Sequence, residues 1–113
     1  MQKVVDILGT EYKIIFKEFD GKQDVDGYSI DGYCDYTSKE IVIRNDNINE
    51  LGDFIDYQKH LLRHEIIHAF MSESGLRSNW QHAAQFGQDE TTVDWFAIQS
   101  PKIYKVYKTL DIL

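Results

Sequence analysis

The chain has 113 residues, of which 42% are hydrophobic, 13% aromatic and 27% charged, a composition that excludes an intrinsically disordered chain and predicts a single compact domain over residues 1–113. Its formal net charge is −7, from 12 basic and 19 acidic residues, which argues against nucleic acid and anionic membranes as general partners. The apolar runs are far shorter than the about 20 residues that span a bilayer, and the single cysteine, Cys34, cannot form an internal disulfide, so we expect a cytoplasmic protein without a membrane partner.

Residues 1–46 are predicted to form a small β-sheet. Apolar residues nearly alternate with polar ones over 12–19, which is the period of a strand with one buried face. Residues 32–36 and 40–44 are two further strand candidates, and the short polar segment between them favours a β-hairpin. Residues 4–8 fit either a first strand or a short helix. Two Asp-Gly pairs indicate turns before the hairpin: Asp20-Gly21 and Asp26-Gly27.

The remainder of the chain is predicted to be mostly helical. Apolar residues recur at helical spacing over 51–74, and Gly75 is placed to end this helix. After a polar connection, residues 88–99 favour a second helix, and Pro101 suits the first turn of a last helix over 101–110. We therefore expect an α+β fold in which a small antiparallel or mixed N-terminal sheet packs on these three helices.

The most informative segment is an H-E-x-x-H motif, His64-Glu65-Ile66-Ile67-His68, inside the first predicted helix. Residues four apart lie one above the other on a helix, so the two imidazoles can bind one Zn²⁺ ion. Glu65 lies at the edge of the same face, from which its carboxylate can act as general base on a water molecule held by the metal. A motif this short also arises by chance, and the alternative is a solvated polar face of the helix.

A catalytic zinc site needs a third protein ligand, and the sequence offers two candidates. Glu90 begins the second predicted helix, and Asp94 lies on the same face, where it can accept a hydrogen bond from the far nitrogen of a ligand histidine. His82, in the polar connection, is the other candidate, and it also fits a substrate-binding role. His60 is excluded from the same ion, because the helix rise of about 1.5 Å per residue sets it about 12 Å from His68.

The H-E-x-x-H motif, together with the downstream E-x-x-x-D pattern, resembles the motifs of the gluzincin metallopeptidases. The resemblance implies a catalytic zinc ion bound by two histidines and one glutamate, which here are His64, His68 and Glu90. It also implies that Glu65 is the general base and that Asp94 supports a ligand histidine. The activity implied is the hydrolysis of peptide bonds in a peptide or protein substrate.

Residues 94–101 look like the end of the glutamate helix in ImmA/IrrE-type metallopeptidases, and the short chain is similar to the minigluzincins and to small phage- and prophage-encoded proteins. One alternative is a SprT-like site with His82 as third ligand, and another is a non-catalytic zinc-binding interaction protein. The residues considered for stabilising an oxyanion or binding substrate are His82, Tyr104 and Tyr107. We expect the substrate to lie between the strands and the helices, paired with an edge strand formed by residues 40–44.

Overall fold

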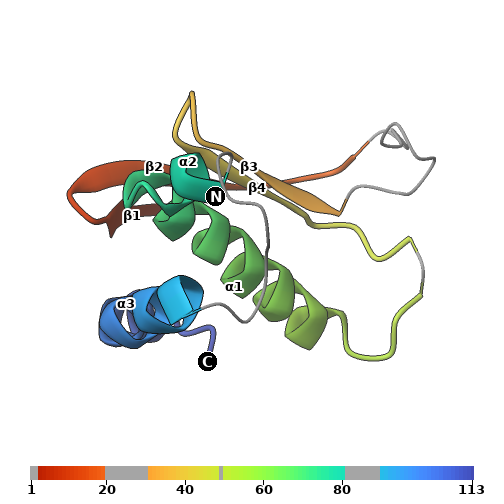
Figure 1. The fold of residues 1–113 in the computed structure, drawn as a ribbon. Helices are drawn as coiled ribbons and strands as arrows, with labels where there is room; N and C mark the ends of the chain where they lie inside the picture. The colour runs from red at the N-terminus through yellow and green to blue at the C-terminus, as the bar shows by residue number, and fades with distance from the viewer. Residues whose placement is uncertain (1–2, 20–30, 49, 81–89) are drawn as a thin grey trace.

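Figure 1 shows the fold in a computed structural model, in which the described residues form four strands and three helices. The structure describes residues 3–19, 31–48, 50–80 and 90–113, and the side chains of all of these except 79, 80, 90, 91, 93 and 94. The strands are β1 (Lys3–Ile7), β2 (Thr10–Lys17), β3 (Gly32–Asp35) and β4 (Glu40–Arg44). The helices are α1 (Phe54–Glu73), α2 (Leu76–Trp80) and α3 (Glu90–Leu110). The expected α+β class is confirmed.

The strands form one mixed sheet in the order β1-β2-β4-β3. β1 and β2 make an antiparallel hairpin, β3 and β4 make the predicted hairpin, and β2 joins the two by pairing parallel to β4. Residues 4–8, for which the sequence favoured neither helix nor strand, lie largely in β1, and the chain turns into β2 through Leu8 and Gly9 at φ 52° and 92°. The turns predicted at Asp20-Gly21 and Asp26-Gly27 lie outside the described residues.

β4 lies inside the sheet, so the expectation that residues 40–44 form an edge strand open to a substrate is wrong. β4 pairs with β2 on one side and with β3 on the other. The continuous apolar run of β4, residues 41–43, fits this position. Every residue after Glu40 in the strand is buried, which is the pattern of a strand covered on both faces. Among the described strands, β1 and β3 are the edges of the sheet; both contact α1, and β3 does so more extensively.

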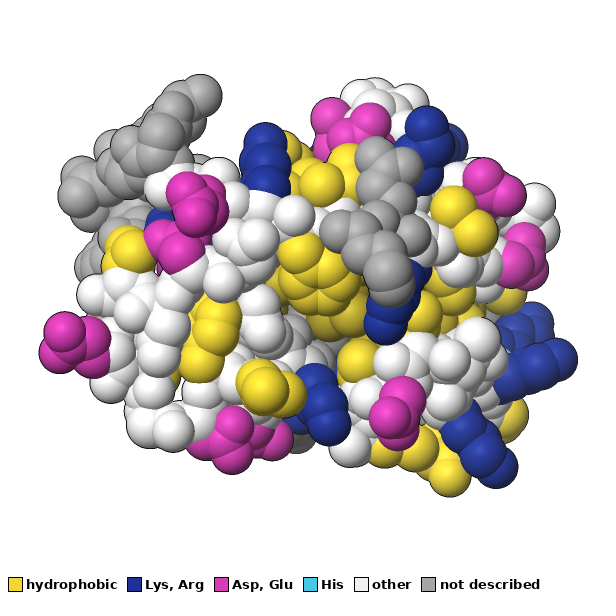
Figure 2. Space-filling view, turned by 180° about the vertical axis from the view of Figure 1, so that it is seen from behind, with side chains coloured by type: hydrophobic (Ala, Val, Ile, Leu, Met, Phe, Trp, Pro, Cys, Tyr) yellow, Lys and Arg dark blue, Asp and Glu magenta, His cyan; other side chains and the backbone are white. Residues whose placement is uncertain are grey.

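α1 and α3 lie on the same side of the sheet (Figure 1). They share one hydrophobic core with it, in which Ile66 and Phe70 of α1 and Ile103 of α3 pack with Ile14 and Ile41 of the sheet. Figure 2 shows hydrophobic side chains recessed in the middle of the back face, with Lys and Arg side chains gathered at the lower right. Within the described ranges, no helix has both the length and the apolar character needed to cross a membrane.

α1 follows the prediction closely, but it begins later than the expected residue 51. Asp53 caps the helix by accepting a hydrogen bond from the backbone N–H of Asp56 at 3.0 Å. The helix ends at Glu73, and Gly75 adopts a φ of 85°, a left-handed conformation that favours glycine. The chain then enters α2, a short helix where the sequence predicted only a polar connection.

α3 is one continuous helix, so the expectation of a separate glutamate helix and C-terminal helix divided at Pro101 is wrong. Proline lacks the N–H that would bond the carbonyl four residues back, and that carbonyl, Ala97 O, accepts a hydrogen bond from Ser100 Oγ at 3.4 Å. The helix also buries Ile103 and Val106 beyond the proline. This burial favours continuation, because packing of an apolar face outweighs a local propensity to stop.

The C-terminal end of α1 is tied to the sheet by a polar cluster. Glu73 Oε2 lies 2.9 Å from Lys39 Nζ and accepts a hydrogen bond from Tyr12 Oη at 2.8 Å. Burial by itself raises the pKa of Glu73, but hydrogen bonds from Lys39, Thr10 and Tyr12 outweigh this effect and hold the pKa below its ordinary value of 4.5. The charged carboxylate of Glu73 therefore stabilises the folded state.

We expect the free energy of unfolding to fall as the pH is lowered through the pKa of Glu73. The unfolded chain takes up this proton first, so the contribution of Glu73 is complete above about pH 4.5 and is lost as the pH falls through the lower pKa of the folded state. Urea unfolding at pH 7 and pH 3 should show a smaller difference for Glu73→Gln than for the native chain. The exposed Glu11→Gln variant is the control, and an unchanged difference in Glu73→Gln would contradict the assignment.

Candidate metal centre

His64 and His68 lie one turn apart on the exposed side of α1. Their Nε2 atoms are 3.2 Å apart, and their ring centroids are 4.9 Å apart with an interplanar angle of 70°. The two rings therefore bring the same nitrogen, Nε2, within hydrogen-bond distance of each other on the helix face where the motif spacing predicts them to meet.

This pair of nitrogens fits a zinc ion. Two nitrogens bound at about 2.0–2.1 Å to one tetrahedral zinc ion lie about 3.3 Å apart, which is close to the separation of the two Nε2 atoms. Partial burial of the ring, together with the charges of His64 and Arg77, holds the pKa of His68 below its ordinary value of 6.5. His68 is thus neutral near pH 7 and keeps a lone pair that a metal can use.

Glu65 lies on the buried side of the same turn of α1, with 7% of its surface exposed. Burial raises the pKa of its carboxyl to about 7, and among the described residues no basic side chain forms an ion pair with it. Gly32 lets β3 lie close to β4, because a Cβ atom there would lie 3.1 Å from the Val42 carbonyl oxygen and 3.2 Å from Cδ1 of Ile43. Cγ of Glu65 would lie 3.7 Å from the same atom, an ordinary contact distance. A carboxyl group that exchanges protons near neutral pH therefore lies beside the two histidines.

The three motif side chains line one groove of about 390 Å³ between α1 and the edge of the sheet. Gly32, Cys34 and Tyr36 line its sheet side, and Arg77 of α2 lines it from beyond the end of α1. Burial raises the pKa of the Cys34 thiol to about 12, so this cysteine is protonated near pH 7. The groove thus combines two converging imidazole nitrogens, a buried carboxyl group and the outermost of the described strands.

The chain was also compared with known proteins. Neither the protein-family models, nor the curated proteins, nor the solved structures give a match. The geometry of this groove and the spacing of the motif that forms it are therefore the features that bear on function.

The candidates for the third ligand fall where the structure describes no side chains. Glu90 and Asp94 lie in the first turns of α3, but the structure describes only their backbone. His82 lies outside the described residues. Trp95 Nε1 donates to Ser74 Oγ at 2.8 Å, which brings this part of α3 to the C-terminal end of α1. Among the side chains that are described, no group of three His, Cys, Asp or Glu could hold a metal ion. The third ligand stays a prediction.

The two tyrosines considered as oxyanion donors do not line the groove. Tyr104 is 52% exposed on α3, and Tyr107 Oη donates to the carbonyl oxygen of Arg63 at 3.2 Å. Burial raises the pKa of Tyr107, which keeps its hydroxyl protonated. Tyr33 and Tyr36 of the predicted hairpin line the groove instead.

Sequence reasoning did not anticipate Tyr36 or Arg77 in the groove. Tyr36 ends the first predicted strand of the hairpin, and Arg77 follows Gly75, where the positive φ turns the chain at the end of α1. A glycine soon after the motif helix was the available signal, because the residues after such a turn can pack back against the helix that they leave.

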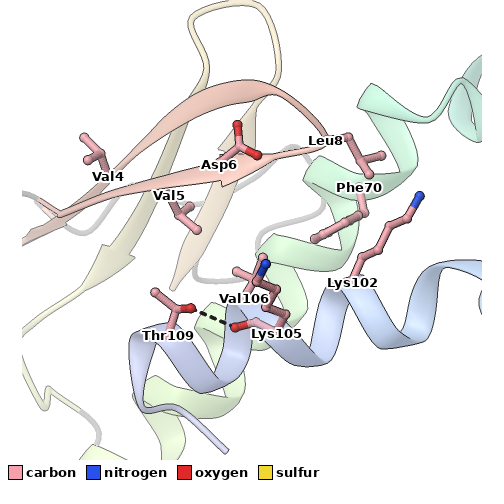
Figure 3. Close-up of a pocket in the computed structure, with 9 residues that line it drawn as sticks. All are labelled: Val4, Val5, Asp6, Leu8, Phe70, Lys102, Lys105, Val106 and Thr109. Atoms are coloured by element: carbon pink, nitrogen blue, oxygen red, sulfur yellow. Dashed lines mark hydrogen bonds between the residues drawn. The ribbon is translucent and has the colours of Figure 1, made fainter.

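A second and larger cavity, of about 460 Å³, lies between β1 and α3 (Figure 3). Val5, Phe70 and Val106 come to it from three different elements, and Lys102 and Lys105 line it from α3. It shares no lining residue with the motif groove and contains no histidine or cysteine. The smaller groove is therefore the candidate site, because the two motif histidines and the buried carboxyl of Glu65 meet there.

Proposed function

We propose that the protein is a zinc-dependent metallopeptidase that hydrolyses peptide bonds in the groove between α1 and β3. One observation carries the proposal, namely the 3.2 Å separation of the Nε2 atoms of His64 and His68 beside the buried carboxyl of Glu65. Two converging imidazoles next to a buried carboxyl are the parts that hydrolysis at a zinc site requires. A solvated polar helix face would require neither the convergence of the rings nor the burial of Glu65.

His64 and His68 would hold the zinc ion, with Glu90 as the proposed third ligand and Asp94 as the acceptor that orients one of the histidines. When bound, zinc would supply Lewis-acid activation of water and of a peptide carbonyl. Glu65 would accept a proton from the attacking water on its carboxylate and return that proton to the leaving amine.

The edge of β3 would bind the peptide. Among the described residues, its outer backbone groups have no strand partner, because β3 is the last strand in the sheet order. An extended peptide can add to such an edge through main-chain hydrogen bonds, which would align it along the groove that His64 and His68 line.

We expect protein purified without chelator to contain one zinc ion per chain, and His68→Ala to lose it. Removal of one of two converging imidazoles leaves too few ligands for a stable site. His60→Ala is the matched control, because His60 is an exposed histidine of the same helix that does not line the groove. Metal analysis by mass spectrometry would contradict the proposal if the native chain held no zinc or if both variants kept it equally.

The third ligand is tested by the same measurement on two further variants. Loss of zinc in Glu90→Gln but not in His82→Ala would support the gluzincin-like arrangement, and the reverse result would support the SprT-like one. Zinc binding without hydrolysis of any peptide would favour the non-catalytic alternative.

A further inference from the structure

Arg77 is held at one end of the motif groove by an aromatic ring. Its guanidinium carbon lies 4.1 Å from the ring centroid of Tyr36, and both residues line the groove together with the motif side chains. Such stacking restrains a long side chain, and it leaves the N–H donors in the plane of the guanidinium group available to a ligand.

Arg77 brings a positive charge to the groove. Among the described residues Arg77 forms no ion pair, although the chain has 19 acidic and only 12 basic residues. Glu73, which is close to Arg77 in the sequence, forms an ion pair with Lys39. Asp35, which is next to Tyr36 in the sequence, accepts hydrogen bonds from Thr37 in the turn that follows it. Among the described residues, the groove therefore presents a stacked cation that has no ion-paired acid, although the buried carboxyl of Glu65 lines the same groove.

We propose that Arg77 binds a carboxylate of the peptide, so that the groove selects substrates with an acidic side chain or a free C-terminus at that position. This inference rests on the proposed function in assuming that the occupant is a peptide. The chemistry favours a carboxylate because the planar guanidinium fork matches its two oxygens in a bidentate pair. The fixed distance from His64 and His68 along the groove would make the preference specific to one position of the peptide.

The test measures binding without turnover, by calorimetry on the Glu65→Gln protein. The probes are blocked hexapeptides of alanine and glycine that carry one glutamate, or one glutamine in its place, at each position in turn. A further set contains the glutamine peptides with a free C-terminal carboxylate. This set distinguishes binding of a glutamate side chain from binding of the C-terminus. Arg77→Met in the same background removes the cation, Arg77→Lys keeps the charge without the planar fork, and Lys105→Met removes an equal charge from the other cavity.

We expect about tenfold tighter binding of the glutamate peptide, or of the free acid, at one position, in line with the strength of a charge-assisted pair. The preference should vanish in Arg77→Met, weaken in Arg77→Lys and persist in Lys105→Met. Equal binding of acid and amide peptides at every position, absence of all peptide binding, or a preference that survives Arg77→Met would each overturn the inference. A carboxylate preference in a protein that hydrolyses nothing would count against the proposed function alone, whereas hydrolysis without that preference would count against this inference alone.

Discussion

Replacing Glu65 with glutamine is expected to lower the rate of peptide hydrolysis by about 10²–10⁴-fold while zinc stays bound, which is the usual contribution of a general base. Glutamine has nearly the shape of glutamate but cannot take up a proton, and Glu65 is not among the proposed zinc ligands. Because Glu65 is buried without a basic partner among the described residues, the neutral side chain should not destabilise the fold. The measurements are hydrolysis of a peptide substrate, zinc content and urea unfolding on the same preparation.

The matched control for this change is Glu11→Gln, which makes the same substitution at an exposed position of β2. It should leave hydrolysis and zinc content unchanged. Hydrolysis at the native rate in Glu65→Gln would refute the role of Glu65 as base. Loss of zinc in Glu65→Gln would show instead that this carboxylate belongs to the metal site.

Replacing Arg44 with methionine is expected to lower the free energy of unfolding by about 3–5 kcal/mol, the usual effect of removing one partner of a buried charge cluster. Arg44 is 2% exposed, and its guanidinium group pairs with Asp31 at 3.0 Å and with Asp46 at 3.1 Å. Asp31 also accepts a hydrogen bond from Tyr57 Oη at 2.6 Å. Methionine fills similar space but leaves Asp31 and Asp46 without their common cation.

Urea unfolding at pH 7 measures this loss, and Lys17→Met is the control. Lys17 is the residue of β2 that pairs with Arg44, but it is exposed, so its replacement should change the free energy of unfolding by no more than about 0.5 kcal/mol. Similar losses in the two variants would show that the buried charge cluster contributes no more than an exposed lysine.

Local patterns predicted the elements that depend on near neighbours. The hairpin of β3 and β4 and the helix α1 were found because a short turn and a long helical period are both properties of adjacent residues. The parallel pairing of β2 with β4 joins segments distant in the chain, and no local signal specifies which strands become neighbours. The division at Pro101 failed for the same reason, since the packing of Ile103 and Val106 outweighs the local preference of proline.

The candidate site shows the same division between local and distant information. The convergence of His64 and His68 follows from helix geometry, so the spacing of two residues in the sequence was enough to predict it. Tyr36 lies in the turn after β3, which precedes α1 in the sequence, and Arg77 lies in α2, which follows α1. The contact between these two residues therefore depends on the packing of the whole fold. Sequence spacing therefore located the motif, whereas the walls of the groove required the structure.

The parallel pairing of β2 with β4 has a consequence for the order of folding. The hairpins β1-β2 and β3-β4 and the helix α1 each form from neighbouring residues, and such local units form on microsecond time scales. Once the β3-β4 hairpin has formed, joining it to β2 requires closure of the segment between Lys17 and Gly32, whose entropy must be lost before the new contacts compensate for it. Because β3 reaches its place in the sheet only through β4, we expect the groove beside His64 and His68 to be completed in this later step of folding.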